Sequence, residues 1–269
     1  FPNSGFTQPA YEKIPERRLE YAQRILRNYN KDSPTLDERC VFTGEPAVGI
    51  AFGDKIPRGR AFRQHIPLLT GENVINFHPY GDSGLPVSGK AILAIQSLPL
   101  GCAKCSGKLL AVHSDNSRLT LHFARYFLTE NIRSIRLVQI AGEKKMPESS
   151  LRQQTLLINM LIQAFSESKE EEESFSLTAY HFSNMGQEVS LDIYHLPLQM
   201  TGFLREMQTA EYRNEWNVIV QRAWEIEPKK KKRDNRAFQP SRNFLYEDLF
   251  DLPENAGRFL RTYFLRQNL

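Results

Sequence analysis

The sequence has little cysteine, no long apolar run and no strong excess of charge of one sign. Its three cysteines cannot form a disulfide framework, and an odd count with one close pair points to a reducing compartment, so we expect a cytoplasmic protein. No apolar run approaches the roughly 20 residues that span a bilayer, which excludes a membrane span. A net charge of +4 is too small by itself to indicate nucleic acid.

The sequence also lacks the motifs of common catalytic sites. It contains no His-x-x-x-His pair, no paired carboxylates in a loop, no Gly-x-Ser-x-Gly and no phosphate-binding P-loop. Ser114 beside His113 is not a catalytic pair, because neighbouring residues on a strand point to opposite faces. We therefore expect a protein that is not an enzyme. The alternative is a metal-dependent endonuclease that uses His78, His113 and Asn116.

The composition that remains is that of an ordinary globular protein. Of the 269 residues, 41% are hydrophobic and 25% are charged, which excludes collagen, a coiled coil and wholesale disorder. The length suits one large domain or two small ones. Separated strands and helices without a regular βαβ alternation predict an α+β fold.

Apolar periodicity divides the chain into three predicted regions. Residues 1–39 hold an amphipathic helix over 16–30 with a basic outer surface, followed by a linker. Residues 40–200 form an α+β core with knuckle-like loops, and residues 201–269 form a helical region. The apolar pattern predicts strands at 91–97, 108–113, 176–182 and 189–196, and helices at 117–127, 151–165, 198–207 and 211–226.

Glycine and proline concentrate between residues 44 and 107, where most of the fifteen glycines lie. A loop-rich stretch of this length usually carries binding or catalysis. It also carries a basic cluster, which suits a phosphate backbone because glycine allows close approach. The alternative is a solvated loop without a ligand. The cluster consists of Lys55, Arg58, Arg60 and Arg63, and a second basic run follows at 229–233.

Polar turns follow the basic cluster. The amides of Asn73 and Asn76 can donate and accept hydrogen bonds at base edges, and neighbouring aromatic rings offer stacking surfaces. Asparagine in a turn more often bonds to its own backbone, which is the competing interpretation. The motifs that follow complete the candidate DNA-binding set with Ser88, Lys90 and Lys104.

Two loops have the shape of zinc knuckles. The two-residue spacing of Cys102 and Cys105 lets both thiolates reach one tetrahedral ion. Cys40 begins a similar loop, but Thr43 stands where its second cysteine would be. Three thiolates and a histidine such as His113 could hold a structural Zn²⁺. The alternative is a degenerate knuckle without metal, whose cysteines pack as small hydrophobic residues.

Several of these segments, taken in order, resemble the CXXC–CXXC family of CRISPR-associated large subunits, found in type I-B-like RNA-guided Cascade surveillance complexes. The resemblance covers residues 40 to 200, and Thr43 departs from it by breaking the first cysteine pair. The segments are CVFTG at 40–44, PLLTG at 67–71, NFHP at 76–79, GLPVSG at 84–89, CAKC at 102–105, HSDN at 113–116 and YHFSNMGQ at 180–187.

The resemblance implies a subunit of a ribonucleoprotein complex in antiviral defence or RNA-guided transposition. Such a subunit sits beside the backbone and handle-binding subunits on the CRISPR RNA and recognises a short protospacer-adjacent motif (PAM) in target double-stranded DNA. It helps to open the duplex into an R-loop, while the guide reads the remaining sequence. It also offers a landing surface to a separate helicase-nuclease or to a targeting protein of a transposition machinery. A zinc-ribbon scaffold with only protein partners is the remaining alternative.

Overall fold

The chain folds into two compact units with helices and short β-sheets, which confirms the α+β class. The first unit comprises Phe1–Pro99 and Phe182–Leu191, and the second comprises Leu100–His181 and Asp192–Leu269. The structure is a computed structural model, and it describes residues 4, 6, 13–53, 56–69, 83–143, 146–167, 175–183, 190–226 and 238–265.

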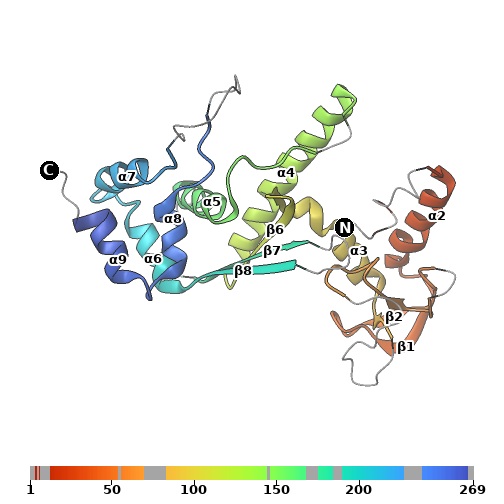
Figure 1. Cartoon of the computed structure of the whole chain (residues 1–269). Helices are drawn as coiled ribbons and strands as arrows, with labels where there is room; N and C mark the ends of the chain where they lie inside the picture. Colours follow the sequence, from red (N-terminus) through yellow and green to blue (C-terminus); the bar gives the residue numbers. More distant parts are fainter. Residues whose placement is uncertain are drawn as a thin grey trace. The chain divides into compact units, whose positions relative to one another are not determined.

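The first unit has a small core between helices α2 and α3 (Figure 1) and two small antiparallel sheets of two strands each. Ile25 of α2 and Ile92 of α3 are fully buried in this core. The N-terminal helix, which was predicted from apolar residues at helical spacing, is confirmed as α2. The elements are α2 (Pro15–Leu26), η1 (Arg27–Tyr29), β1 (Thr35–Arg39), β2 (Pro46–Val48), β3 (Arg60–Ala61), β4 (Leu85–Pro86), α3 (Gly89–Ser97) and η2 (Leu98–Gly101).

The strand predicted at 91–97 is wrong, because these residues form helix α3. A short apolar run does not distinguish a strand from a buried helix, so the residue that caps the start of a helix becomes the informative one. Ser88 provides that signal, since its hydroxyl accepts a hydrogen bond of 3.2 Å from the Ala91 amide. Gly89 then lets the helix approach η1 closely, because a Cβ at this position would lie 1.7 Å from the Asn28 carbonyl oxygen.

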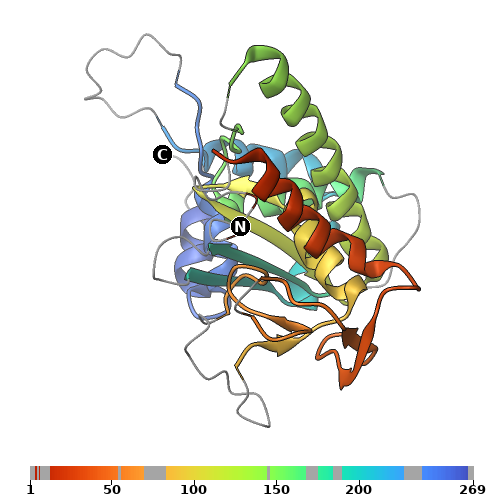
Figure 2. The same ribbon diagram turned by 90° about the vertical axis from the view of Figure 1, so that its right-hand side faces the viewer.

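The second unit contains a larger apolar core, built where helices pack on the β-strands. Its strands belong to one sheet of order β5-β6-β7-β8, and helix α4 packs on β6 (Figure 2). The predicted strands at 108–113, 176–182 and 189–196 are confirmed. The strands are β5 (Ala103–Cys105), β6 (Lys108–Ser114), β7 (Leu177–Ser183) and β8 (Ser190–Leu196), of which residues 182–191 group with the first unit.

The helices of the second unit follow the predicted apolar periodicity. Asn116 caps α4, because its side-chain oxygen accepts hydrogen bonds from the amides of Arg118 and Leu119. Gly142 ends the same helix in the left-handed conformation at φ 67°. The helical elements are α4 (Ser117–Ala141), α5 (Gln153–Glu167), α6 (Leu198–Glu206), α7 (Arg213–Arg222), α8 (Phe244–Asp248), η3 (Leu249–Asp251), α9 (Ala256–Leu260) and η4 (Arg261–Leu265).

The division between the units differs from the predicted regions, whose boundaries lay at residues 40 and 200. The core of the first unit joins α2 to the strands and to α3, so the N-terminal helix is not a separate region. The chain passes to the second unit at Leu100. Within the described residues, no helix combines the length and the apolar composition that crossing a bilayer requires.

Candidate nucleic-acid interface

The turn at Arg58 and Gly59 presents a cation on the surface of the first unit. Gly59 adopts φ 71°, and a Cβ here would lie 2.8 Å from the Val48 carbonyl oxygen, so only glycine fits. Its amide donates to the Ile50 carbonyl (2.9 Å), and its carbonyl accepts from the Val87 amide (3.0 Å). These bonds hold the turn, and the Arg58 side chain is exposed.

Arg58 is available for a ligand. Among the residues that the structure describes, its side chain has no hydrogen-bond or ion-pair partner. An exposed guanidinium on this turn can meet a phosphate without first breaking a contact to the described residues. Arg58 is therefore the member of the predicted set that the structure leaves best suited to bind a phosphate.

Arg60 is used inside the protein instead. It lies on β3 with only 8% of its surface exposed, and its guanidinium pairs with the Glu38 carboxylate at 2.5 Å. A second hydrogen bond of 3.4 Å reaches the Gly84 carbonyl. A phosphate would have to displace the half-buried Glu38 from a guanidinium that is itself nearly buried, so we remove Arg60 from the candidate interface. Arg63 lies nearby and is half-buried.

Three other predicted DNA-binding residues have structural partners. Ser88 is buried as the cap of α3, and its hydroxyl oxygen lies 3.0 Å from that of Thr43. Lys90 pairs with Glu45 at 2.6 Å on the surface. Lys104, in the second unit, pairs with Glu148 at 3.2 Å and also donates to the Met146 carbonyl. The remaining predicted residues, Lys55, Asn73 and Asn76, lie outside the described residues.

Sequence analysis noted the basic surface of α2 but did not include it in the site. Arg17 and Arg18 are exposed on this helix and Arg27 on the η1 turn that follows it, and both elements belong to the same unit as Arg58. Arg24 pairs with Glu20 one turn away, at 2.6 Å. The arginines interleaved with apolar residues in the sequence already indicated this basic surface. They add cations to a unit whose Gly-rich turns suit a phosphate backbone.

Cys102 and Cys105 have no third metal-binding side chain grouped with them among the described residues. Burial raises the pKa of the Cys102 thiol to about 12 and also raises that of Cys105, whereas zinc binds thiolates. The Cys105 thiol donates to the Leu151 carbonyl at 3.1 Å. The described part of the chain contains no group of three residues with metal-binding side chains. Cys40 lies in the first unit and the other two in the second, so a shared site stays a prediction.

The second knuckle-like loop is a β-hairpin. Strands β5 and β6 pair directly at Cys105 and Lys108, and the two residues between them have positive φ, 49° at Ser106 and 78° at Gly107. This is the backbone of a two-residue hairpin turn. The glycine after the cysteine pair is therefore explained by the turn alone.

The first knuckle-like loop is held by hydroxyl groups. Burial alone would raise the pKa of Cys40, but hydrogen bonds from the Thr43 hydroxyl and the Ser88 backbone bring it below its usual value. The Cys40 carbonyl accepts from the Gly44 amide at 2.9 Å, which closes the loop. Thr43 thus contributes a hydrogen bond where a second cysteine would contribute a metal ligand.

Of the three residues proposed for an endonuclease, one serves a structural role, one is exposed and one lies outside the described residues. Asn116 caps α4 through its side-chain oxygen. Asp115 accepts from the amide and the hydroxyl of Ser176 at 2.9 and 3.1 Å, which ties β7 to the start of α4. His113 is exposed on β6, and His78 lies outside the described residues.

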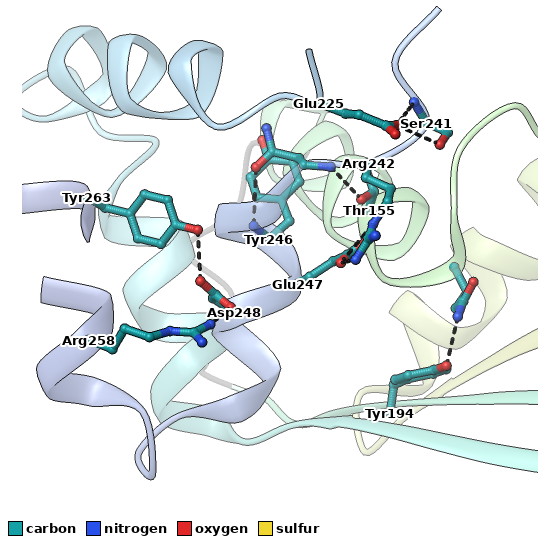
Figure 3. A network of polar contacts seen from close by, with 12 residues as sticks. Thr155, Tyr194, Glu225, Ser241, Arg242, Tyr246, Glu247, Asp248, Arg258 and Tyr263 are labelled. Atoms are coloured by element: carbon teal, nitrogen blue, oxygen red, sulfur yellow. Dashed lines mark hydrogen bonds and ion pairs between the residues drawn. The ribbon is translucent and has the colours of Figure 1, made fainter. Parts of the chain in front are cut away.

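A second polar cluster, in the C-terminal helices, is also structural (Figure 3). The Arg242 guanidinium donates hydrogen bonds to both carboxylate oxygens of Glu247. Asp248 accepts hydrogen bonds from Arg258 and from the Tyr263 hydroxyl. Burial, together with Asp248, raises the pKa of Tyr263 well above its usual range. These contacts tie α8 to the segments before and after it, and the phenol stays protonated.

Comparison of the chain with protein-family models, with curated proteins and with solved structures found no match. The resemblance to Cascade large subunits consequently rests on the ordered sequence motifs. The resemblance leads us to expect cations that can contact DNA phosphates. Among the predicted DNA-binding residues that the structure describes, Arg58 on the glycine turn of the first unit is exposed in the way that such a contact requires.

Proposed function

We propose that this chain is the large subunit of an RNA-guided CRISPR surveillance complex, and that it binds target double-stranded DNA through its first unit. The function includes recognition of the PAM, assistance in R-loop formation, and docking of a helicase-nuclease or a transposition targeting protein. Its other partners are the CRISPR RNA and the backbone and handle-binding subunits. The ordered motifs between residues 40 and 187 support the family, and Arg58 supports the DNA contact.

The exposed Arg58 on a rigid glycine turn is the observation that carries the DNA contact. Phosphate contacts position a protein on a duplex, and base contacts specify the sequence. Arg58 has the exposure and the charge for the first task. The second task falls to Asn73 and Asn76 in the proposal, and changing either to alanine is expected to alter the preferred motif in a PAM library screen.

Binding of a 30-base-pair duplex across a salt series tests the phosphate contact. We expect R58A to weaken binding and to reduce the slope of log K against log salt by about 0.9 if it removes one phosphate contact. R222A is the matched control, because Arg222 is exposed on α7 in the second unit. Parallel slopes for wild type and R58A would remove Arg58 from the interface.

Purification of the tagged chain from its host tests the complex itself. The proposal predicts one RNA of uniform length and several protein subunits in the same particle. Recovery of the chain with proteins alone would contradict the RNA-guided function and would favour a protein scaffold. The two experiments fail separately, because one reads a single side chain and the other reads the assembly.

A further inference from the structure

Helix α4 has apolar side chains on two opposite faces. Leu119, Phe123 and Phe127 are buried against the core of the second unit. On the other side, Leu128 and Ile132 expose 38% and 39% of their surfaces. A surface helix of a globular protein usually has one apolar stripe, and a helix that is apolar all round is usually covered all round.

The exposed apolar residues of α4 alternate with arginines along one line. Leu121, Arg125, Leu128, Ile132 and Arg136 are spaced four, three, four and four residues apart, so they share one helix face over about 22 Å. We call these five residues the outer stripe of α4. Figures 1 and 2 show the end of α4 extending beyond the sheet and the other helices of the second unit.

Two hollows follow this stripe. The first has a volume of about 710 Å³ and is lined in part by Leu121, Arg125 and Tyr126. The second, of about 400 Å³, is lined by Thr129, Ile132, Arg133, Arg136 and Leu137. Thr129 borders both hollows, and we call the two hollows together the groove of α4. Glu130 and Glu167 also border the first hollow.

The charge along the far half of the groove is positive. Arg125, Arg133 and Arg136 are exposed, and none of them has a side-chain partner within the described ranges. Residues 131–141 contain no aspartate or glutamate. The far half of the groove therefore offers aliphatic contacts together with Arg133 and Arg136, which have no ion-pair partner among the described residues.

We propose that the outer stripe of α4 binds an amphipathic helix of another protein, one with leucine-like residues in its centre and carboxylates at its edges. An apolar helix face in a groove is a common mode of peptide recognition, and the arginines select an acidic partner. Nucleic acid fits less well, because aliphatic side chains neither stack on bases nor bond to phosphates. A second copy of the same face would place arginine against arginine.

This inference does not depend on the DNA contact proposed above. The outer stripe belongs to the second unit, whereas Arg58 belongs to the first. Loss of α4 binding with intact DNA binding, or the reverse, can therefore be observed separately in the full chain.

The probe is a fluorescent 21-residue helical peptide with leucine at the a and d positions and glutamate at the e and g positions. Its control has lysine at e and g. Polarisation titrations with the full chain should show binding of the acidic peptide at least tenfold tighter than binding of the basic one. The triple variant R125E/R133E/R136E should lose about tenfold in affinity for the acidic peptide, as three exposed ion pairs predict. I132D should also weaken binding, whereas R222E should not.

Exposed substitutions of this kind should leave the thermal midpoint unchanged, and circular dichroism checks this for each variant. Equal binding of the two peptides, or none, overturns the proposal. It is also overturned if a 30-base-pair duplex binds wild type but not the triple variant, because the stripe would then serve nucleic acid. Self-association in sedimentation that I132D abolishes would assign the face to a second copy instead.

Discussion

The two units are stabilised in different ways. The first unit has a small core interrupted by buried polar groups, among them Arg60, His65 and Ser88, and its β-strands are short. The second unit also buries polar groups, such as Thr155 and Asn243, but within a much larger core of mostly leucine, isoleucine and aromatic side chains. Apolar burial is non-directional, whereas a buried polar group requires its own partner. The first unit therefore depends on individual contacts, and the same contacts hold the turn that carries Arg58.

Glycine substitution should show this difference most strongly. A Cβ on Gly89 would lie 1.7 Å from the Asn28 carbonyl oxygen, so G89A must separate α3 from η1 in the first unit. We expect a loss of about 4 kcal/mol or more in the free energy of unfolding, measured by urea denaturation. The control is G101A in the second unit, where a Cβ would meet Ala124 at an ordinary 3.7 Å. Equal effects of the two variants would contradict the close packing of α3.

Acid should affect the first unit through His65. Burial lowers the pKa of this histidine to about 4, and its Nδ1 accepts a hydrogen bond from the Phe62 amide. The unfolded chain therefore binds this proton below about pH 6.5 while the folded chain does not. Stability should fall by about 3 kcal/mol as the pH drops from 6.5 to 4, and should rise again with pH.

His65→Asn isolates that contribution, because its side-chain oxygen can accept the same hydrogen bond without titrating in this range. Thermal unfolding of both proteins across the pH series gives the comparison. The difference in stability should narrow toward pH 4. A constant difference across the series would show that His65 does not remain neutral in the folded protein.

Arg60 and Arg58 should separate stability from binding. R60A leaves Glu38 without its partner and should reduce the free energy of unfolding by about 2 kcal/mol. R58A removes an exposed side chain and should change it by less than about 0.5 kcal/mol. Chemical denaturation measures both values. The reverse ranking would mean that Arg60 is not held by Glu38.

Removal of metal should have the smallest effect. The Cys105 thiol is used in a hydrogen bond to the Leu151 carbonyl, and no third metal-binding side chain is grouped with it among the described residues. We expect the thermal midpoint to be the same with and without EDTA, and elemental analysis to find zinc well below one ion per chain. A midpoint that falls with chelator would restore the zinc prediction.

Sequence patterns predicted the second unit better than the first. The predicted strand at 108–113 and the helix at 151–165 match β6 and α5, because long periodic segments bury one face. The helix predicted at 117–127 matches only the first part of α4, which continues to Ala141. In the first unit, α3 was missed because nine apolar-rich residues have no clear period, and the serine before them decided the outcome. The hydrophobic pattern is informative where burial dominates, and less so where single hydrogen bonds dominate.

The candidate site shows the same limit. Basic residues within a few positions of one another look equivalent in sequence, yet Arg60 is buried beside Glu38 and Arg58 is exposed. The difference comes from a contact between residues that lie 22 positions apart. The chain pattern also gave no reason to expect that Thr43 and Ser88 meet in space. Non-local pairs of this kind have no signature in one sequence.

The central claim is that the Arg58 turn touches target DNA within an RNA-guided particle. Photocrosslinking from a benzoylphenylalanine placed at position 58 tests it most directly, using the affinity-purified assembly and a labelled target duplex. We predict a crosslink to the duplex that requires a matching guide RNA. Crosslinks to protein alone, in an assembly that binds the target, would contradict the claim.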